Sequence, residues 1–246
     1  MRTAIRWLLT GIAVVGTAVL VVEAGRWGPR EVPSSDRSRE AVERTSRKLA
    51  PLLSRKDLRL GAPVFLRIFK EEKLLEVWLQ DGKRFELFES YPICYFSGEL
   101  GPKQKEGDRQ SPEGFYSVLP AALNPNSQFH LSFNLGYPNT FDRAHGRTGS
   151  FLMVHGSCVS IGCYAMTDPG IEEIYTLVEA ALRNGQGAFQ VHSFPFRMTP
   201  ENLARHRPSE WWEFWANLQE GYDLFERDRV PPGVRVRGGR YVFAPA

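Results

Sequence analysis

The chain has 246 residues, of which 42% are hydrophobic, 12% aromatic and 24% charged, so its composition excludes disorder, collagen and coiled coil as descriptions of the whole chain. Its 22 glycines and 17 prolines are more than a helical bundle carries, and they predict a mainly β fold with added helices. Residues 60–246 hold 19 Lys and Arg against 22 Asp and Glu, so we expect no nucleic-acid-binding surface on the folded domain.

Residues 1–24 are typical of a signal peptide or an N-terminal membrane anchor. Two arginines precede an uncharged run of 16 residues, 7–22, whose length lies between a signal-peptide core and a membrane-spanning helix. Val22 and Ala24 fit the small-residue positions before a cleavage site, so both interpretations stay open. Either one predicts export, to the periplasm or cell envelope.

Residues 25–60 are predicted to form a basic stalk with one short helix. The helix is expected over Ser38–Leu53, with Pro51 limiting its end. Val42 and Leu49 fall on one helical stripe while arginines line the rest, which indicates a docking or spacer helix with a solvated basic face. Binding of peptidoglycan or lipid headgroups by this face is the alternative.

Residues 61–196 carry the pattern of the main domain. Strands are expected at 64–70, 74–79, 84–89, 128–133, 150–155 and 188–194. Asp81-Gly82 predicts a hairpin turn, and Asp168-Pro169 predicts the start of a helix that runs to Leu182. The polar, Gly- and Pro-rich stretch 98–120 is too long for a plain turn and is a candidate functional loop.

Residues 197–246 are expected to be a helical extension packed on the domain. The helical pattern covers Pro200–Arg227 and contains clustered tryptophans, among them Trp211, Trp212 and Trp215. Large aromatic side chains in such a cluster indicate a lid that packs on the core.

The candidate catalytic chemistry lies between residues 154 and 168. His155 ends a predicted strand, and Cys163 follows it in a turn that contains Gly162. Cysteine attacks an acyl carbon as the thiolate, and a nearby imidazole can take its proton. Gly162 allows a close backbone approach, so amides at Gly162–Tyr164 could stabilise an oxyanion, with Ser160 orienting the turn.

Three motifs in this order resemble the YkuD-type L,D-transpeptidase catalytic domain. They are Ser111-Pro112-Glu113-Gly114-Phe115-Tyr116, Val154-His155-Gly156 and Ser160-Ile161-Gly162-Cys163, which match a TPxGxF-like strand entry, HG and S-x-G-C. Stretches 69–79, 98–116 and 134–149 look like its YafK-like branch. The resemblance covers about 64–194.

The resemblance implies a YkuD-like β-sandwich whose Cys163 attacks a carbonyl of a peptidoglycan stem peptide, with His155 as base and no cofactor. An amine or water would then resolve the thioester, so the expected activity is crosslinking, or attachment and release of a wall-linked peptide or lipoprotein. A peptidoglycan hydrolase using the same Cys-His pair is the alternative within enzymes. A non-catalytic cell-wall peptide-binding module is the alternative from another class.

Two positions depart from the commoner family pattern, in which a His stands at Ile161 and an Arg at Ala165. Because neither residue can pair with a carboxylate, donor recognition is expected to fall to other groups. The candidates for substrate binding are Arg143, Arg147, His145 and Arg109.

The remaining histidines and cysteines suggest no metal site and at most one disulfide. His130, His145, His155 and His192, with Asp142 or Asp168, show no metal-binding spacing, so we expect no metal site. Three cysteines in an exported protein allow one disulfide and one free thiol. Cys163 is the candidate free thiol, whereas Cys94 and Cys158 could be bridged or could be two buried thiols.

Overall fold

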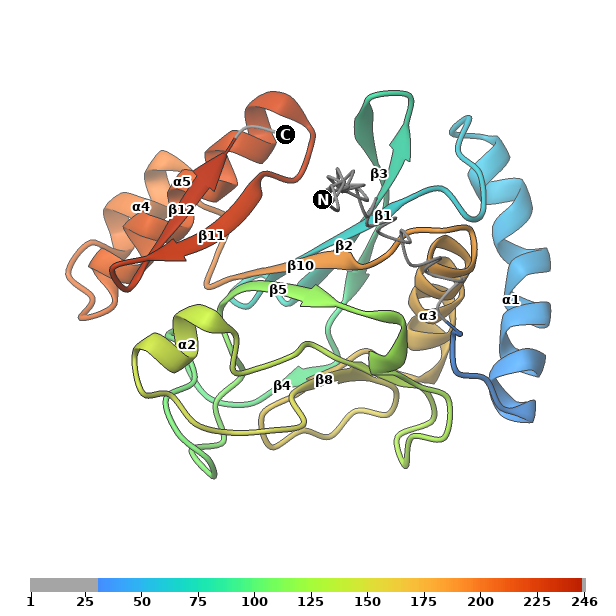
Figure 1. The fold of residues 1–246 in the computed structure, drawn as a ribbon, viewed down its shortest axis with the longest axis horizontal. Coiled ribbons are helices and arrows are strands. Elements are labelled where there is room, and N and C mark those ends of the chain that lie inside the picture. Colours follow the sequence, from blue (N-terminus) through green and yellow to red (C-terminus); the bar gives the residue numbers. More distant parts are fainter. Residues whose placement is uncertain (1–30, 245–246) are drawn as a thin grey trace, which may run out of the picture.

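The computed structural model describes residues 31–244, so the predicted signal or anchor segment lies outside the described residues. Two five-stranded sheets form the body of the domain (Figure 1). The first sheet has the order β3-β2-β1-β10-β5 and comprises β1 (Val64–Phe69), β2 (Leu74–Asp81), β3 (Arg84–Pro92), β5 (Gly114–Val118) and β10 (Phe189–Phe194). β1 pairs in parallel with β10, and the other neighbours in this sheet are antiparallel.

The second sheet is built from shorter strands and carries the catalytic motifs. Its order is β4-β9-β8-β7-β6, with β4 (Tyr95–Phe96), β6 (Leu123–Asn124), β7 (Ser132–Asn134), β8 (Met153–His155) and β9 (Tyr164–Ala165). Between the sheets and around them lie a 3-10 turn at Pro120–Ala122 and the helices α2 (Thr140–Ala144) and α3 (Asp168–Arg183). The mixed sheets and helices confirm the predicted α+β class.

The helix α1 (Asp36–Ser54) is part of this domain. Its buried side chains, such as Leu49 and Leu53, pack into the same core as both sheets and α3. Salt bridges from Arg44 to Glu172 and from Lys48 to Glu173 also fasten α1 to α3. Of the two interpretations of this helix, docking or spacer, its contacts with the core and with α3 favour docking.

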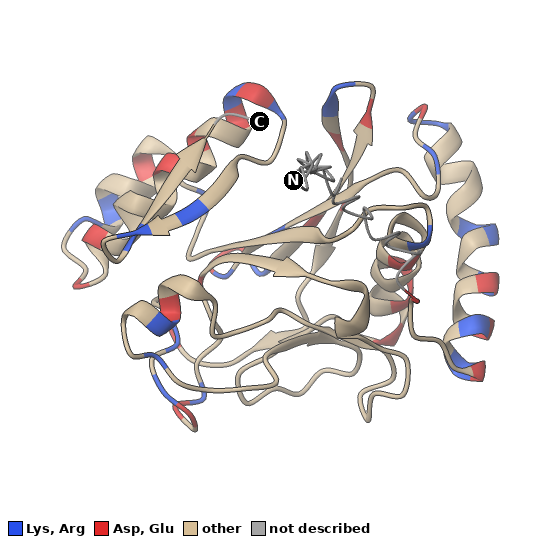
Figure 2. Ribbon diagram, in the orientation of Figure 1, with Lys and Arg blue, Asp and Glu red and all other residues tan. Residues whose placement is uncertain are grey.

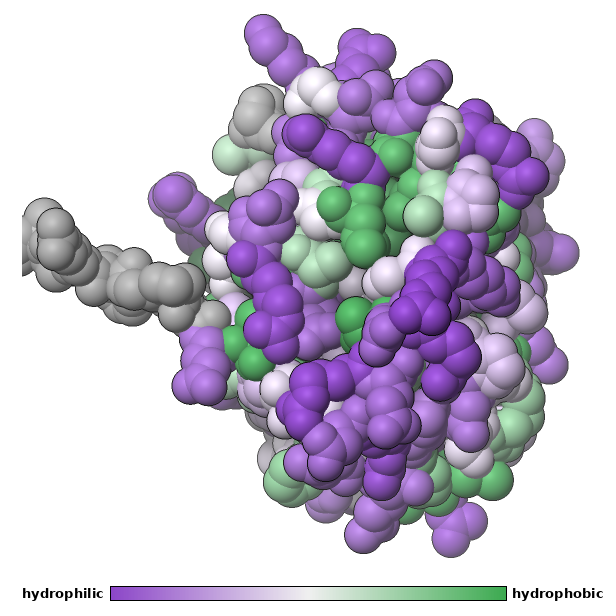
Figure 3. All heavy atoms as spheres, turned by 90° about the vertical axis from the view of Figure 1, so that its right-hand side faces the viewer, coloured by the Kyte–Doolittle hydropathy of each residue, from purple (hydrophilic) through white to green (hydrophobic). Residues whose placement is uncertain are grey.

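Pro51 lies in the last turn of α1, which ends within one residue of the expected Leu53. The helix passes Pro51 and continues to Ser54. A proline removes one intrahelical hydrogen bond, and here the burial of Leu53 behind it stabilises the last turn. The outward side of the molecule that carries α1 is mostly hydrophilic, with hydrophobic atoms visible only in small areas (Figure 3).

The C-terminal extension is helical over most of the predicted Pro200–Arg227 range, and it ends in a hairpin that the sequence did not predict. Helices α4 (Pro200–His206) and α5 (Trp212–Asp228) are followed by an antiparallel hairpin of β11 (Gly233–Arg237) and β12 (Arg240–Ala244). The hairpin packs on α5, because Phe243 and Tyr241 join an aromatic core with Trp215 and Phe115. The buried Trp215 confirms that the tryptophan cluster packs on the domain.

Among residues 31–244, no helix combines the length and the apolar character that a membrane crossing requires.

Candidate active site

His155 and Cys163 lie on two neighbouring strands of the second sheet. β8 and β9 pair in parallel, with Val154 opposite Tyr164 and His155 opposite Ala165. Cys163 precedes Tyr164 and lies beside β8, where the Met153 amide donates to its Sγ at 3.4 Å. The strand pairing therefore brings the two candidate catalytic residues together, although no hydrogen bond between their side chains is found in the described part of the chain.

The imidazole of His155 is buried and held in one orientation. Its Nδ1 lies 2.5 Å from the Gly156 carbonyl oxygen, and Phe129 stacks on the ring at a centroid distance of 4.6 Å. Because a carbonyl oxygen only accepts, this contact requires the proton on Nδ1 and leaves the lone pair on Nε2. Burial lowers the pKa of His155, so the ring is neutral and can act as a base at neutral pH.

Position 156 has no room for a side chain, because neighbouring atoms pack closely against Gly156. A Cβ at this position would lie 2.6 Å from Asp168 Oδ1 and 2.7 Å from the Phe129 carbonyl oxygen. Asp168 accepts from the Ser157 amide at 2.7 Å, and the Gly156 amide donates to the Phe129 carbonyl at 3.0 Å. The small residue after His155 thus lets the start of α3 and the Phe129 segment pack closely around His155.

Cys163 is a half-buried free thiol. Burial raises its pKa, while the Met153 amide and the charge of Lys103 act in the opposite direction with smaller effect. The thiol can also donate to the Phe151 carbonyl oxygen, 3.5 Å away. With the pKa of His155 lowered and that of Cys163 raised, the resting pair is neutral, and proton transfer must accompany attack.

Ser160 holds the turn before Cys163. Its Oγ donates to the Cys163 carbonyl at 2.8 Å and accepts from the Gly162 amide at 3.0 Å, and Ser111 Oγ donates to the same carbonyl at 3.1 Å. Gly162 has a φ of +149°, which favours glycine. The Gly162 amide is therefore occupied, whereas the Cys163 amide has no hydrogen-bond partner among residues 31–244 and is available to an oxyanion.

The Tyr164 side chain points into the core. It is fully buried, and its hydroxyl donates to the Pro112 carbonyl at 2.7 Å. This contact joins the strand after the nucleophile to the Ser111–Tyr116 motif. Tyr164 can therefore contribute to the site only through its backbone.

A disulfide joins Cys94 to Cys158, and Cys163 is free. This confirms the bridged alternative. Cys94 precedes β4, and Cys158 lies in the loop between β8 and β9 that leads to Cys163. The bond thus fastens that loop to the edge of its own sheet.

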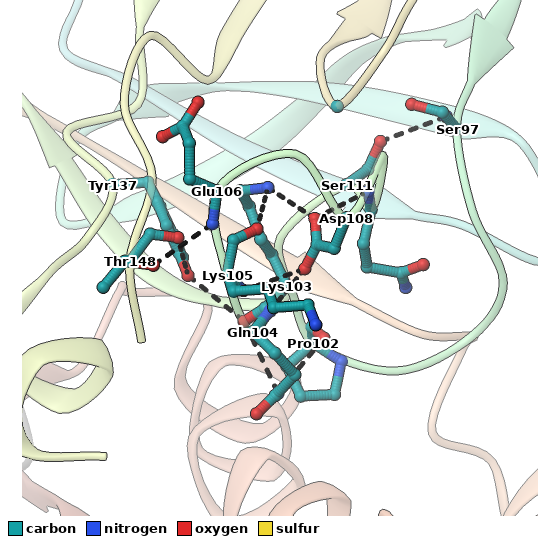
Figure 4. Close-up of polar contacts among 12 residues, drawn as sticks. Ser97, Pro102, Lys103, Gln104, Lys105, Glu106, Asp108, Ser111, Tyr137 and Thr148 are labelled. Carbon is teal, nitrogen blue, oxygen red and sulfur yellow. Dashed lines mark hydrogen bonds and ion pairs between the residues drawn. The ribbon is translucent and has the colours of Figure 1, made fainter. Parts of the chain in front are cut away.

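The polar loop 97–111 is ordered by internal hydrogen bonds (Figure 4). Asp108 accepts from Lys103 Nζ at 2.5 Å and from the amides of Gln104, Lys105 and Gln110 at 2.8–3.0 Å. The Tyr137 hydroxyl donates to the Lys103 carbonyl at 3.2 Å. The buried Lys103 contributes a positive charge near Cys163, and the sequence analysis missed it because no motif marks a lysine in such a loop.

The buried Lys70 fastens this loop to the first sheet. Its Nζ donates to the carbonyls of Glu99, Gly101 and Ser111 and to Glu113 Oε1, at 2.7–3.2 Å. Glu113 Oε2 accepts from Trp215 Nε1 at 2.8 Å. The first motif, the functional loop and the C-terminal extension therefore meet at one buried ion pair.

The four candidate substrate-binding residues have different surroundings. Arg147 is buried, donates to Asp142 at 2.9 Å and lies over the rings of Phe141 and Phe214, so it does not face an open groove. Arg143 is exposed and donates to the Pro138 carbonyl. The exposed His145 stacks on Phe141, and the exposed Arg109 lies in the 97–111 loop.

The two positions that depart from the family pattern also differ. Ile161 is 81% exposed, two residues before Cys163, and Phe151 is 71% exposed on the segment that contacts the Cys163 thiol. Ala165 is fully buried in β9. Exposed apolar side chains thus border Cys163. Of the two departing positions, Ile161 is accessible to a substrate and Ala165 is not.

No group of three or more His, Cys, Asp or Glu side chains with metal-binding geometry occurs in residues 31–244.

The chain is similar to a known catalytic-domain family and to a named relative in it. The family model for the YkuD L,D-transpeptidase catalytic domain matches residues 63–186. The protein named "Putative L,D-transpeptidase YafK" of Escherichia coli (strain K12) is 52% identical over 185 residues, which are 75% of each chain.

Two solved structures match parts of this chain with low identity. The helical cell shape determining protein Pgp2 of Campylobacter jejuni has a TM-score of 0.43 and 16% identity, covering 78% of this chain and 79% of its own. Bd1075 of Bdellovibrio bacteriovorus has a TM-score of 0.39 and 21% identity, covering 67% of this chain and 60% of its own.

Proposed function

Because the chain belongs to the YkuD L,D-transpeptidase catalytic-domain family, we propose that it is a cysteine acyl-enzyme acting on peptidoglycan stem peptides. Cys163 is the nucleophile and His155 the base. The observation that carries this proposal is the fixed tautomer of His155, whose Nδ1 is bound to the Gly156 carbonyl, beside the single free thiol of the described residues.

The geometry supports general-base attack by a neutral pair. His155 Nε2 takes the thiol proton as Cys163 Sγ bonds to the substrate carbonyl carbon, and the Cys163 amide donates to the oxyanion that forms. When the intermediate collapses, the peptide C–N bond breaks and the leaving amine receives the proton from His155. An acceptor amine or water then cleaves the thioester with the same proton transfers in reverse.

Acylation of a single thiol tests this proposal. A carbapenem, which acylates many members of the family, should add one adduct by intact mass that peptide mapping assigns to Cys163. Cys163→Ala should form no adduct and should not turn over tetrapeptide muropeptides, while its thermal unfolding stays close to wild type. A Cys163→Ala variant that still processes muropeptides would exclude the cysteine mechanism, and a wild type that binds muropeptides without turnover would indicate a binding module.

The second candidate function is hydrolysis, in which water instead of an acceptor amine cleaves the thioester. The exposed Ile161 stands where the family pattern has a histidine, so this chain lacks that polar group beside the nucleophile. We expect a larger share of hydrolysed product than in family members with the histidine. The ratio of crosslinked to hydrolysed muropeptides distinguishes transpeptidation from hydrolysis. Ile161→His should shift this ratio towards crosslinking.

We also propose that the protein is exported through residues 1–24 and acts in the cell envelope. The Cys94–Cys158 disulfide supports this, because such bonds persist in oxidising compartments. Cell fractionation with nonreducing peptide mapping tests it. Cytoplasmic protein with three free thiols would contradict it.

A further inference from the structure

A groove of about 730 Å³ separates the C-terminal hairpin from the edge of the first sheet. Val234–Val236 of β11 line one side, and Phe115–Ser117 of β5 line the other. Within residues 31–244, β11 pairs only with β12 and β5 only with β10, so each strand has one free edge. In Figure 1, β11 lies on the side of the hairpin that faces β5 and α2.

The free edge of β11 offers unused backbone groups to this groove. The Tyr241 amide and carbonyl of β12 bond to the Asn217 side chain at 2.9 and 3.0 Å, so they turn away from β11. Tyr241 is opposite Val236, which makes this a non-hydrogen-bonded pair of the hairpin. The amide and carbonyl of Val236, and those of Val234 two residues before, therefore point towards the free edge.

The β5 side of the groove offers fewer free backbone groups for strand pairing than the β11 side. The Phe115 amide donates to the Tyr241 hydroxyl at 3.4 Å, and the Phe115 carbonyl accepts from Asn139 Nδ2 at 2.8 Å. These contacts cap the beginning of the β5 edge with side chains. A chain that enters the groove would thus pair with β11 and lie against β5.

The side chains of β11 define what such a chain must carry. Val234 and Val236 are half-buried on one face, whereas Arg235 and Arg237 are exposed on the other and form no salt bridge among the described residues. Arg143 of α2 stands on the opposite rim, and no Asp or Glu lines the groove. Figure 2 shows the Lys and Arg positions on the hairpin and on α2.

We propose that this groove binds an extended acidic segment of a partner protein, which adds as a strand to the free edge of β11. Residues opposite each other on paired strands interact on the same face, so the segment alternates apolar residues beside Val234 and Val236 with acidic residues beside Arg235 and Arg237. A regular alternation of this kind requires successive L-residues, which favours a polypeptide over a stem peptide. The proposal does not depend on the reaction at Cys163.

A synthetic peptide probes this site directly. A fluorescein-labelled heptapeptide of alternating valine and glutamate should bind the full chain in anisotropy titrations. The alternating valine and lysine heptapeptide, and the valine and glutamate peptide with alternate amides N-methylated, should bind at least about tenfold more weakly. Equal binding of the lysine or the N-methylated peptide would overturn the proposal, as would displacement of the probe by tetrapeptide muropeptides.

Two variants test the two parts of the recognition. Arg235→Glu should weaken binding of the acidic peptide about tenfold, because an attractive cross-strand pair becomes a repulsive one. Val236→Pro removes an amide that points to the free edge, a place where an edge strand tolerates proline, and should weaken binding to a similar degree. Arg59→Glu, an exposed arginine outside the groove, is the matched control and should bind as wild type. Unchanged binding by Arg235→Glu would overturn the proposal even if Val236→Pro failed to fold.

Discussion

Replacing Lys70 by methionine should destabilise the domain strongly, although the substituted residue lies outside the proposed catalytic pair. The side chains of Lys70 and Glu113 are both fully buried, with Nζ and Oε1 2.9 Å apart. Methionine has a similar length and no charge, so the change leaves the Glu113 carboxylate with two donors, the Gly101 amide and Trp215 Nε1. Removing one partner of a buried ion pair costs about 3–5 kcal/mol, because the remaining charge stays desolvated.

This loss should be visible as a lower melting temperature. In a chain of this size 1 kcal/mol corresponds to a shift of about 2–4 °C, so the expected decrease is about 6–20 °C. Urea unfolding of Lys70→Met, Glu113→Gln and the double variant gives the coupling between the two residues, and the double variant should lose less stability than the sum of the singles. The exposed Lys83→Met is the control, with an expected change within about 0.5 kcal/mol.

A loss of less than about 1 kcal/mol in Lys70→Met, a value typical of an ordinary surface contact, would contradict a buried ion pair at this position. Additive effects of the two substitutions would contradict it as well. Loss of activity in Lys70→Met at a temperature where the protein stays folded would indicate that the loop 97–111, which Lys70 holds through three carbonyls, orders the site around Cys163.

Further predictions concern the pH dependence, the disulfide and the arginines. The acidic limb of the kcat/KM profile should lie below pH 6.5, the usual pKa of histidine, because burial lowers the pKa of His155 and the neutral ring is the active form; a limb above that value in a pH-rate titration would contradict the neutral pair. Burial holds the pKa of His192 well below the unfolded value, so the unfolded state binds more protons below about pH 6.5 and stability falls as the pH falls through that range. His192→Phe should therefore reduce the loss of unfolding free energy between pH 7.5 and pH 5, and an unchanged loss would assign it to other groups. Cys158→Ser should cost up to about 4 kcal/mol in chemical unfolding, because the bond closes a loop with a sequence separation of 64; equal stability of wild type with and without reductant would count against this. Arg147→Ala should lower the melting temperature, because it leaves the buried Asp142 carboxylate without its charge partner. Arg143→Ala should change the unfolding free energy by no more than about 0.5 kcal/mol and should raise the donor KM; the opposite pattern would reverse the roles of the two arginines.

The long strands and α3 could be predicted from the sequence because their signals are local. β1, β2 and β10 alternate or concentrate β-branched and aromatic residues, and α3 begins at Asp168-Pro169, as expected. The short strands β4, β6 and β9 have two residues each, too few for any periodicity to show. The hairpin of β11 and β12 was not predicted for a related reason, because its two strands have five residues each and the first carries arginines between its valines.

The candidate nucleophile and base could be named from the sequence because HG and S-x-G-C are short motifs with their own chemistry. Their surroundings could not be. Phe129 lies 26 positions before His155, and the two rings stack in the folded chain. Trp215 lies 102 positions after Glu113, and its indole donates a hydrogen bond to that carboxylate. Arg147 shows the converse, since its sequence context suggested a substrate contact and its fold environment is a buried pair with Asp142.

What the sequence by itself determined is therefore the candidate Cys-His pair, the use of glycine at Gly162, and the strands and helices long enough to carry a period. Only the tertiary structure decided which cysteines are bridged, which nitrogen of His155 is free and which charges are buried. The physical reason is that desolvation and hydrogen bonding depend on every atom around a group. For Lys70, Glu113 and Cys163 those atoms come from segments far apart in the chain, which meet only when both sheets and the C-terminal extension close on one core.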